Sequence, residues 1–339
     1  MTLDQAVALS LREDLPRVGL TARLLESDPE LLELAAPLVE RAHTERERAA
    51  AEGVFVLPWN DPLMPPQLIA ISDAPPALWY RGSLECLNHP AVAIVGSRAA
   101  SAVALETARR LAADLASAGI TVVSGLARGV DSAAHRGALD AGQTIAVLGS
   151  GVDLIYPREH IELADRIADR GLVISEYPPG TPPLPFHFPM RNRLISGLSR
   201  AVVVIEAADN SGSLITASCA AEQGRDVMAV PGNVLSGRNR GGHALIRDGA
   251  KIVECADDIV VELGLRPPAQ IGAAGQGSNN RSMSSEDPVL SRMDPACTYD
   301  LDSLAAASGM TAPRLLPHLA DLELRGLVRR AGGGRFMRQ

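Results

Sequence analysis

The sequence has almost no lysine, no closely spaced cysteines and no long apolar run. Lys251 is the only lysine, so the basic residues are nearly all arginine, a bias that a GC-rich genome would also produce. The four cysteines lie far apart without a CxxC pair, which indicates neither a zinc site nor a disulfide framework. No apolar segment is long enough to cross a bilayer, and the first residues lack the basic and apolar regions of a signal peptide. We therefore expect a cytoplasmic protein with no membrane span, metal or cofactor.

The charge of the chain limits how it could bind nucleic acid. Its 339 residues are 46% hydrophobic, enough for a large core and for two or three domains. The formal net charge is −8, so the molecule as a whole repels a polynucleotide. Any nucleic-acid site must therefore be a local groove that concentrates basic side chains.

Apolar strands alternate with helical stretches from about residue 90 to residue 264. The strands are nearly continuous runs of Val, Ile and Ala, as expected when both faces of a parallel sheet are buried. This pattern predicts an α/β fold with a doubly wound, mostly parallel sheet. The proline-rich stretch 55–82 should wrap the sheet edge and add a strand near Ala77–Tyr80. The expected strands are 91–96, 120–124, 144–149, 172–177, 201–206, 226–230 and 251–255.

Composition divides the chain into four parts. Residues 1–54 carry leucines at helical spacing and the N-cap pair Asp28-Pro29, which predicts a small SAM-like helical module. This module could touch a DNA backbone or cap the next domain, and we favour a cap or a protein contact. Residues 55–264 hold the sheet, and residues 265–288 are polar and predict a flexible linker. Residues 289–339 predict a helix-turn-helix with a two-stranded, glycine-tipped wing, which is a winged-helix domain.

Arginine recurs in the turns that follow apolar strands. Arg98 ends the run Gly96-Ser97-Arg98, Arg128 follows the next strand, and Arg191 and Arg193 lie together further along. Open parallel sheets bind ligands beyond the carboxyl ends of their strands, where backbone N–H groups favour anions. Guanidinium groups hold phosphate in a bidentate fork, so these arginines indicate a ligand with several phosphates, such as a polynucleotide. The G-x-G-x-x-G pattern of a dinucleotide site is absent, and a lone arginine would more often form a surface salt bridge.

Neighbouring polar and aromatic residues have structural explanations as well as functional ones. Asp131 should cap the helix that begins there rather than act in catalysis, with His135 one turn later as its hydrogen-bonded partner. The segment Ser211–Ala217 opens a helix with small hydroxyl residues, which can both cap it and cradle an anion. Phe186 and Phe188 lie among prolines close to arginines, where they could stack on the bases of a single strand or belong to the core.

Several strings in one order resemble the bacterial DNA-processing protein A family (DprA, also called Smf). They are Gly96-Ser97-Arg98, Ser124 through Asp131 with Ala134-His135, Thr144 through Gly149, Ser175-Glu176, Phe188 through Leu198, Ser211 through Ala217, and Val230-Pro231-Gly232. The resemblance covers most of the chain. It implies an extended Rossmann-like domain that binds single-stranded DNA as a homodimer and is not an enzyme. It also implies a protein that protects incoming DNA and loads the RecA recombinase during natural transformation and recombination.

The resemblance also implies which residues contact DNA. Arg98, Arg191 and Arg193 match the family motifs best, and Ser97, Arg128 and Phe188 match more loosely. The full set of candidate DNA-binding residues is Ser97, Arg98, Arg128, Phe188, Arg191, Asn192, Arg193, Gly212, Ser213 and Thr216. We expect that replacing Arg98 or Arg191 weakens DNA binding and leaves thermal stability nearly unchanged.

The sequence leaves two alternative functions from other protein classes open. The same layout occurs in lysine-decarboxylase-like nucleotide phosphoribohydrolases, and Glu222 is a loose counterpart of their catalytic glutamate. Their P-G-G-x-G-T-x-x-E run is absent, and Asp209-Asn210-Ser211-Gly212-Ser213 stands instead. A transcriptional regulator would read duplex DNA through the winged helix, which the net charge and Pro317 inside the expected recognition helix disfavour.

Overall fold

The computed structural model describes the chain as two compact units, Met1–Ile271 and Gly272–Gln339. The described residues are 1–12, 14–15, 19–265, 287, 289–293, 298–308, 310–324, 327–331 and 335–338. Nearly all of the expected linker and the expected glycine tip of the wing lie outside the described residues, so these two predictions remain predictions.

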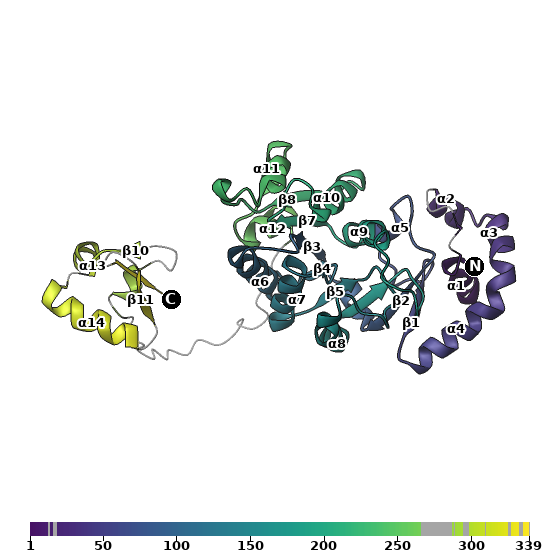
Figure 1. The fold of residues 1–339 in the computed structure, drawn as a ribbon, viewed down its shortest axis with the longest axis horizontal. Helices are drawn as coiled ribbons and strands as arrows, with labels where there is room; N and C mark the ends of the chain where they lie inside the picture. The colour runs from purple at the N-terminus through teal and green to yellow at the C-terminus, as the bar shows by residue number, and fades with distance from the viewer. Residues whose placement is uncertain are drawn as a thin grey trace, which may run out of the picture. The chain divides into compact units, whose positions relative to one another are not determined.

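A nine-stranded sheet forms the centre of the first unit (Figure 1). Its order is β1-β2-β6-β5-β4-β3-β7-β8-β9; the pairs from β6 to β9 are parallel, and β1–β2 and β2–β6 are antiparallel. The strands are β1 (Phe55–Pro58), β2 (Ala77–Gly82), β3 (Ala91–Gly96), β4 (Thr121–Ser124), β5 (Thr144–Val147), β6 (Leu172–Ser175), β7 (Ala201–Ile205), β8 (Asp226–Ala229) and β9 (Lys251–Ile252). The prediction of a doubly wound, mostly parallel sheet is confirmed, and β2 is the strand expected in the proline-rich stretch.

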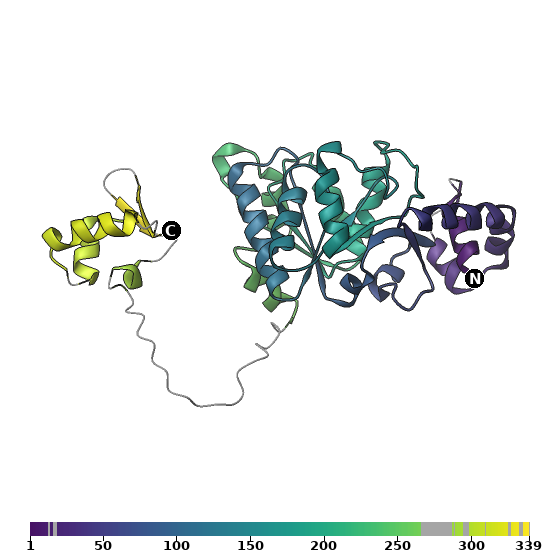
Figure 2. The same ribbon diagram turned by 90° about the horizontal axis from the view of Figure 1, so that it is seen from below.

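Helices cover both faces of this sheet (Figure 2), because successive residues of a buried strand point to opposite sides. On β3, Ala93 and Val95 belong to one core cluster, while Val92 and Ile94 belong to another. The helices that follow β1 are α5 (Pro66–Ile69), α6 (Ala102–Ser117), α7 (Val130–Ala141), α8 (Ile161–Arg170), α9 (His187–Gly197), α10 (Gly212–Glu222), α11 (Arg240–Arg247) and α12 (Ala256–Glu262). Within the described residues, no helix has the length and apolar character needed to cross a membrane.

The N-terminal helices pack on the edge of the sheet. They are α1 (Leu3–Ser10), α2 (Leu20–Leu25), α3 (Pro29–Ala35) and α4 (Val39–Ala51). Leu9 and Leu31 share one core cluster with Trp79 of β2, whose side chain is fully buried. Asp28 caps α3 as expected, because its carboxylate accepts a hydrogen bond from the Glu30 N–H at 3.0 Å. These helices thus belong to the same compact unit as the sheet, as a helical cap should.

The second unit has the expected helices and strands of a winged helix. They are β10 (Thr298–Tyr299), α13 (Leu301–Ser308), α14 (Ala312–Leu324), β11 (Val328–Ala331) and β12 (Arg335–Arg338), with the sheet order β10-β12-β11. Leu304, Leu319 and Phe336 are buried together in its core. Pro317 lies inside α14, where it removes one backbone hydrogen bond of the helix.

Candidate nucleic-acid interface

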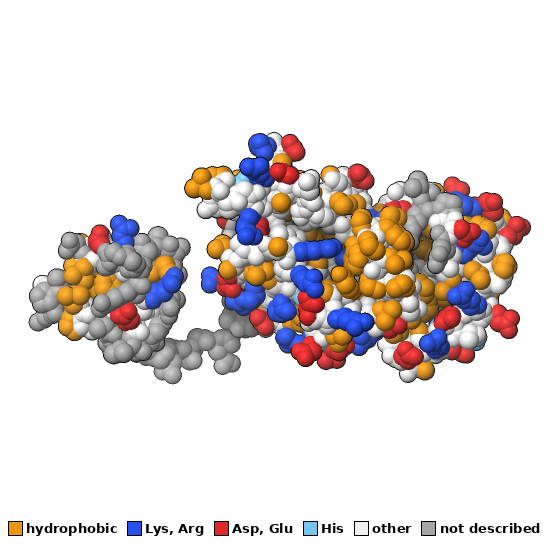
Figure 3. Space-filling view, in the orientation of Figure 1, with side chains coloured by type: hydrophobic (Ala, Val, Ile, Leu, Met, Phe, Trp, Pro, Cys, Tyr) orange, Lys and Arg blue, Asp and Glu red, His pale blue; other side chains and the backbone are white. Residues whose placement is uncertain are grey.

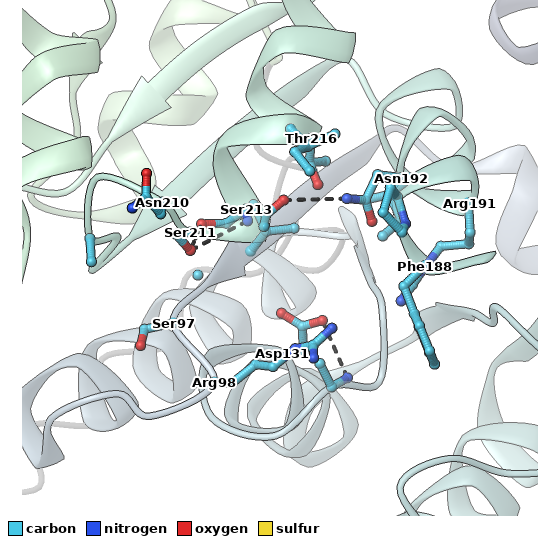
Figure 4. Close-up of a pocket in the computed structure, with 18 of the residues that line it drawn as sticks. Ser97, Arg98, Asp131, Phe188, Arg191, Asn192, Asn210, Ser211, Ser213 and Thr216 are labelled. Atoms are coloured by element: carbon cyan, nitrogen blue, oxygen red, sulfur yellow. Dashed lines mark hydrogen bonds between the residues drawn. The ribbon is translucent and has the colours of Figure 1, made fainter. Parts of the chain in front are cut away.

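A cavity of about 500 Å³ lies at the carboxyl ends of β3 and β7 (Figure 4). The strand order reverses here, because β3 has β4 on one side and β7 on the other. Doubly wound sheets bind their ligands at such switch points. All the candidate residues except Arg128 and Arg193 line this cavity, namely Ser97, Arg98, Phe188, Arg191, Asn192, Gly212, Ser213 and Thr216.

The turn after β3 is fixed against β7. A Cβ atom on Gly96 would lie 2.0 Å from the Ile205 carbonyl oxygen, so only glycine allows this close approach. The Ser97 N–H donates to the Glu206 carbonyl oxygen at 2.8 Å. The Glu206 carboxylate in turn accepts from the Ser101 N–H at 2.8 Å, at the start of α6. These contacts hold the following residue, Arg98, at the rim of the cavity.

Arg98 is the exposed cation of this cavity. Its guanidinium lies 5.7 Å from the centroid of the Phe188 ring, a cation–π distance. Among the residues that the structure describes, no carboxylate forms an ion pair with Arg98, in contrast to Arg128 and Arg193. Figure 4 shows Arg98 on one side of the cavity and the start of α10 on the other. The guanidinium is therefore available to an anion.

Arg191 lies beneath the cavity instead of projecting into solvent. Its side chain is 3% exposed, and its Nη1 atom donates to the Val147 carbonyl oxygen at 2.5 Å. Burial lowers the pKa of Arg191 to about 10, the negative charge of Asp131 opposes this shift, and Arg98 adds to it. A Cβ on Gly125 would lie 2.0 Å from Arg191 Nη1, so this glycine makes room for the guanidinium. The expectation that Arg191 contributes little to thermal stability does not fit this burial.

Asp131 organises the loop between β4 and α7. Its buried carboxylate accepts from the Gly125 N–H at 3.1 Å and the Ala127 N–H at 3.3 Å. Burial raises the pKa of Asp131, and the charge of Arg191 opposes that shift. Asp131 thus has a structural role, but the expected helix cap is wrong, because Gly129 is the N-cap of α7 and the Asp131 carboxylate binds the preceding loop instead. The expected Asp131–His135 hydrogen bond is wrong, because His135 Nδ1 lies 2.8 Å from Thr144 Oγ1 on the neighbouring strand.

The start of α10 forms the opposite wall of the cavity. Ser211 caps this helix, and its hydroxyl lies 2.7 Å from the hydroxyl of Ser213. Nothing lies within 4 Å of the position that a Gly212 Cβ would occupy, so the backbone is open to a ligand there. Asn192 Nδ2 donates to the Gly212 carbonyl oxygen at 3.3 Å and ties α9 to α10. A helix N-terminus with small hydroxyl side chains favours an anion.

One known family matches the part of the chain that builds this cavity. The profile of the family described as DNA recombination-mediator protein A matches residues 55–264. The chain belongs to that family. A second profile, for the DprA winged helix domain, matches residues 278–334. The family resemblance and the winged-helix prediction are thereby confirmed.

This chain is similar to individual members of the DNA recombination-mediator protein A family over most of their length. The chain is 45% identical to DNA processing protein DprA of Streptococcus pneumoniae, over 66% of this chain and 78% of that protein. It is 39% identical to Protein Smf of Escherichia coli, over 82% of this chain and 76% of that protein.

Two solved structures of this family have the same fold. The X-ray structure of DprA from Streptococcus pneumoniae has a TM-score of 0.68 at 38% identity and covers 77% of this chain and 98% of its own. A structure of DprA from Helicobacter pylori has a TM-score of 0.57 at 30% identity and covers 62% of this chain and 95% of its own. The latter was described for the single-stranded DNA binding mode of that protein.

Two candidate arginines of this family member lie outside the cavity. Arg193 is buried and pairs with Asp73 at 2.8 Å and with Glu176 at 2.7 Å. Arg128 is exposed and pairs with Glu159. The buried double ion pair gives Arg193 a structural role, whereas the exposed pair of Arg128 is easily exchanged.

Sequence reasoning missed Tyr156 and Asn210, and it included Ser211 only as part of the segment Ser211–Ala217 that can cradle an anion. Asn210 and Ser211 line the main cavity, and the Tyr156 ring lies 5.6 Å from the Phe188 ring. The signal for Tyr156 was available, because it is an aromatic residue next to proline and arginine, as Phe188 is. The phosphoribohydrolase counterpart Glu222 is the last residue of α10, about 9 Å along the helix from Thr216, the last α10 residue that lines the cavity.

Acid should destabilise this protein through His135. Thr144 Oγ1 donates to the Val122 carbonyl oxygen at 2.7 Å, so it accepts a hydrogen bond from His135 Nδ1. Burial lowers the pKa of His135 from its usual value of 6.5 to about 3, so the imidazole is neutral at pH 7. Between these values the unfolded chain binds a proton that the folded chain does not. Stability should therefore fall as the pH falls from 6.5 to 3, with a slope approaching about 1.4 kcal/mol per pH unit for this group.

This pH dependence can be measured by urea unfolding of the wild type and of His135→Asn, which keeps a donor near Thr144. The variant should lose less stability than the wild type between pH 7 and pH 5. Equal losses in the two proteins would show that His135 does not cause the acid sensitivity.

Proposed function

We propose that this member of the family is a single-stranded DNA-binding mediator that protects incoming DNA and loads RecA during natural transformation and recombination. The observation that carries the proposal is Arg98, an exposed cation without a carboxylate partner among the described residues, placed against Phe188. Phosphate can pair with the guanidinium while a base stacks on an aromatic ring nearby, and this combination suits single strands of any sequence.

The remaining part of the proposal concerns partners and chemistry. A homodimer formed through the Rossmann-like domain and the transfer of DNA to RecA follow from the family resemblance. We further propose that the protein has no hydrolytic activity. The position of Glu222 at the far end of α10 supports this, because the helix separates its carboxylate from the cavity.

Binding of the full chain to oligothymidine and to a duplex of the same length tests the function. Single-stranded DNA should bind more tightly, with little dependence on sequence, and its affinity should fall as salt rises because bound phosphates release counterions. Equal affinity for the duplex would contradict the proposed groove. Release of a base from nucleoside monophosphates, abolished by Glu222→Gln, would favour the phosphoribohydrolase instead.

A further inference from the structure

A second, smaller cavity adjoins the main one on the far side of Phe188. Its volume is about 70 Å³, and Arg98, Ala127, Phe188 and Arg191 line both cavities. The residues that line only the smaller cavity include Arg128 and Tyr156. Figure 3 shows Lys and Arg side chains gathered over the region of β3 and β4, with hydrophobic side chains beside them near α9. A ligand that leaves the main cavity along this surface therefore meets further cationic and aromatic groups.

Tyr156 is built to present an aromatic face there. Tyr156 is 45% exposed. The planes of the Tyr156 and Phe188 rings are inclined at 46°, and the ring centroids are 5.6 Å apart. Phe188 also contacts Arg98, so Arg98, Phe188 and Tyr156 form a continuous row. The two ring centroids lie further apart than the rise of about 3.4 Å per nucleotide along the axis of a duplex, at which successive bases stack. Two neighbouring bases held by these rings would be unstacked from each other, which a duplex does not allow.

Arg128 supplies the charge beside this ring. It pairs with Glu159, with Nη2 and Oε2 3.1 Å apart, and both side chains are more than half exposed. Exposed ion pairs contribute little to stability, so a phosphate can replace the carboxylate at small cost. The hydrogen bond and the charge of Glu159 raise the pKa of Arg128, and Tyr156 contributes least to this shift. Arg128 and Tyr156 line the same cavity.

We propose that this smaller cavity is a second nucleotide subsite, in which a base stacks on Tyr156 and its phosphate displaces Glu159 from Arg128. The proposal rests on the proposed function, since it extends the path of the same single strand. It makes Tyr156 a binding residue and makes Glu159 an internal competitor of DNA for Arg128.

The test compares an oligothymidine with a strand of the same length that lacks bases but keeps every phosphate. Tyr156→Ala should weaken binding of the oligothymidine roughly tenfold, within the range typical of one base on one aromatic ring. Binding of the abasic strand should change less than twofold, and Tyr156→Phe should behave as the wild type. Equal weakening for both strands would show that Tyr156 only supports the local structure, and no change for either strand would show that no base reaches it.

A matched control and a second variant keep the outcomes distinct. Phe55 lies on the edge strand β1 and forms a comparable aromatic pair with Tyr80, with the ring centroids 5.8 Å apart. Phe55→Ala removes this exposed ring and should leave DNA affinity unchanged.

Glu159→Gln should strengthen binding several-fold at low salt, an effect that shrinks as salt rises. Unchanged or weaker binding in Glu159→Gln would overturn the exchange at Arg128. If the wild type shows no preference for single strands, the proposed function fails rather than this subsite.

Discussion

Replacement of Arg191 with methionine should lower the unfolding free energy by about 3–5 kcal/mol, the usual cost of removing one partner of a buried charged group. The substitution removes the hydrogen bond to the Val147 carbonyl oxygen and leaves the buried Asp131 carboxylate without its nearby positive charge. Loosening of the Asp131 loop should also weaken DNA binding. Chemical denaturation of the wild type and the variant measures the stability change.

A double variant separates charge from packing. Adding Asp131→Asn to Arg191→Met removes the uncompensated charge, so part of the lost stability should return, and the two effects should not add. An Arg191→Met protein as stable as the wild type would show that the guanidinium does not support the loop. It would restore the expectation that Arg191 mainly contacts DNA.

Replacement of Arg98 with alanine should weaken single-stranded DNA binding by about 1–3 kcal/mol, or roughly tenfold to a hundredfold, as is typical of hydrogen bonds to charged groups. Stability should stay within about 0.5 kcal/mol of the wild type, because the side chain is exposed. Fluorescence anisotropy at several salt concentrations measures the affinity. Arg98→Lys should recover only part of it, since an ammonium group cannot form the bidentate fork.

Arg200→Ala is the matched control for Arg98. Arg200 is an exposed arginine just before β7, at the opposite end of the sheet from the cavity. Its removal changes the net charge as Arg98→Ala does, so long-range attraction should fall equally in both. Comparable losses of affinity in the two variants would mean that Arg98 acts only through the general field and that the cavity is not the DNA site.

The strands of the sheet and the place of the cavity were predictable because they depend on local patterns. Runs of Val, Ile and Ala fix where the strands lie, and Gly96 followed by a turn of mostly small residues marks a strand end that a ligand can approach. The alternation of strands and helices then places several such ends on one edge of the sheet. No partner distant in sequence has to be known for these inferences.

The roles of the individual arginines were less predictable because they depend on distant partners. Arg98 and Arg193 look alike in the sequence, yet Arg193 meets carboxylates at Asp73 and Glu176. Arg191 is buried because Gly125, far away in sequence, leaves space for its guanidinium. His135 bonds to Thr144 instead of Asp131 for the same reason, since the neighbouring strand supplies the closer partner.

The pairing of β3 with β7 has a consequence for when the protein can first bind its ligand. Val92 lies opposite Ala201, and the strands β4, β5 and β6 come between them in the chain. Such distant pairs close late, because a long loop must be ordered before the contact forms. A chain still on the ribosome and synthesised only through β6 lacks α9, β7 and the start of α10. Nascent and prematurely terminated chains that end before α9 therefore lack the cavity, which is the proposed DNA site.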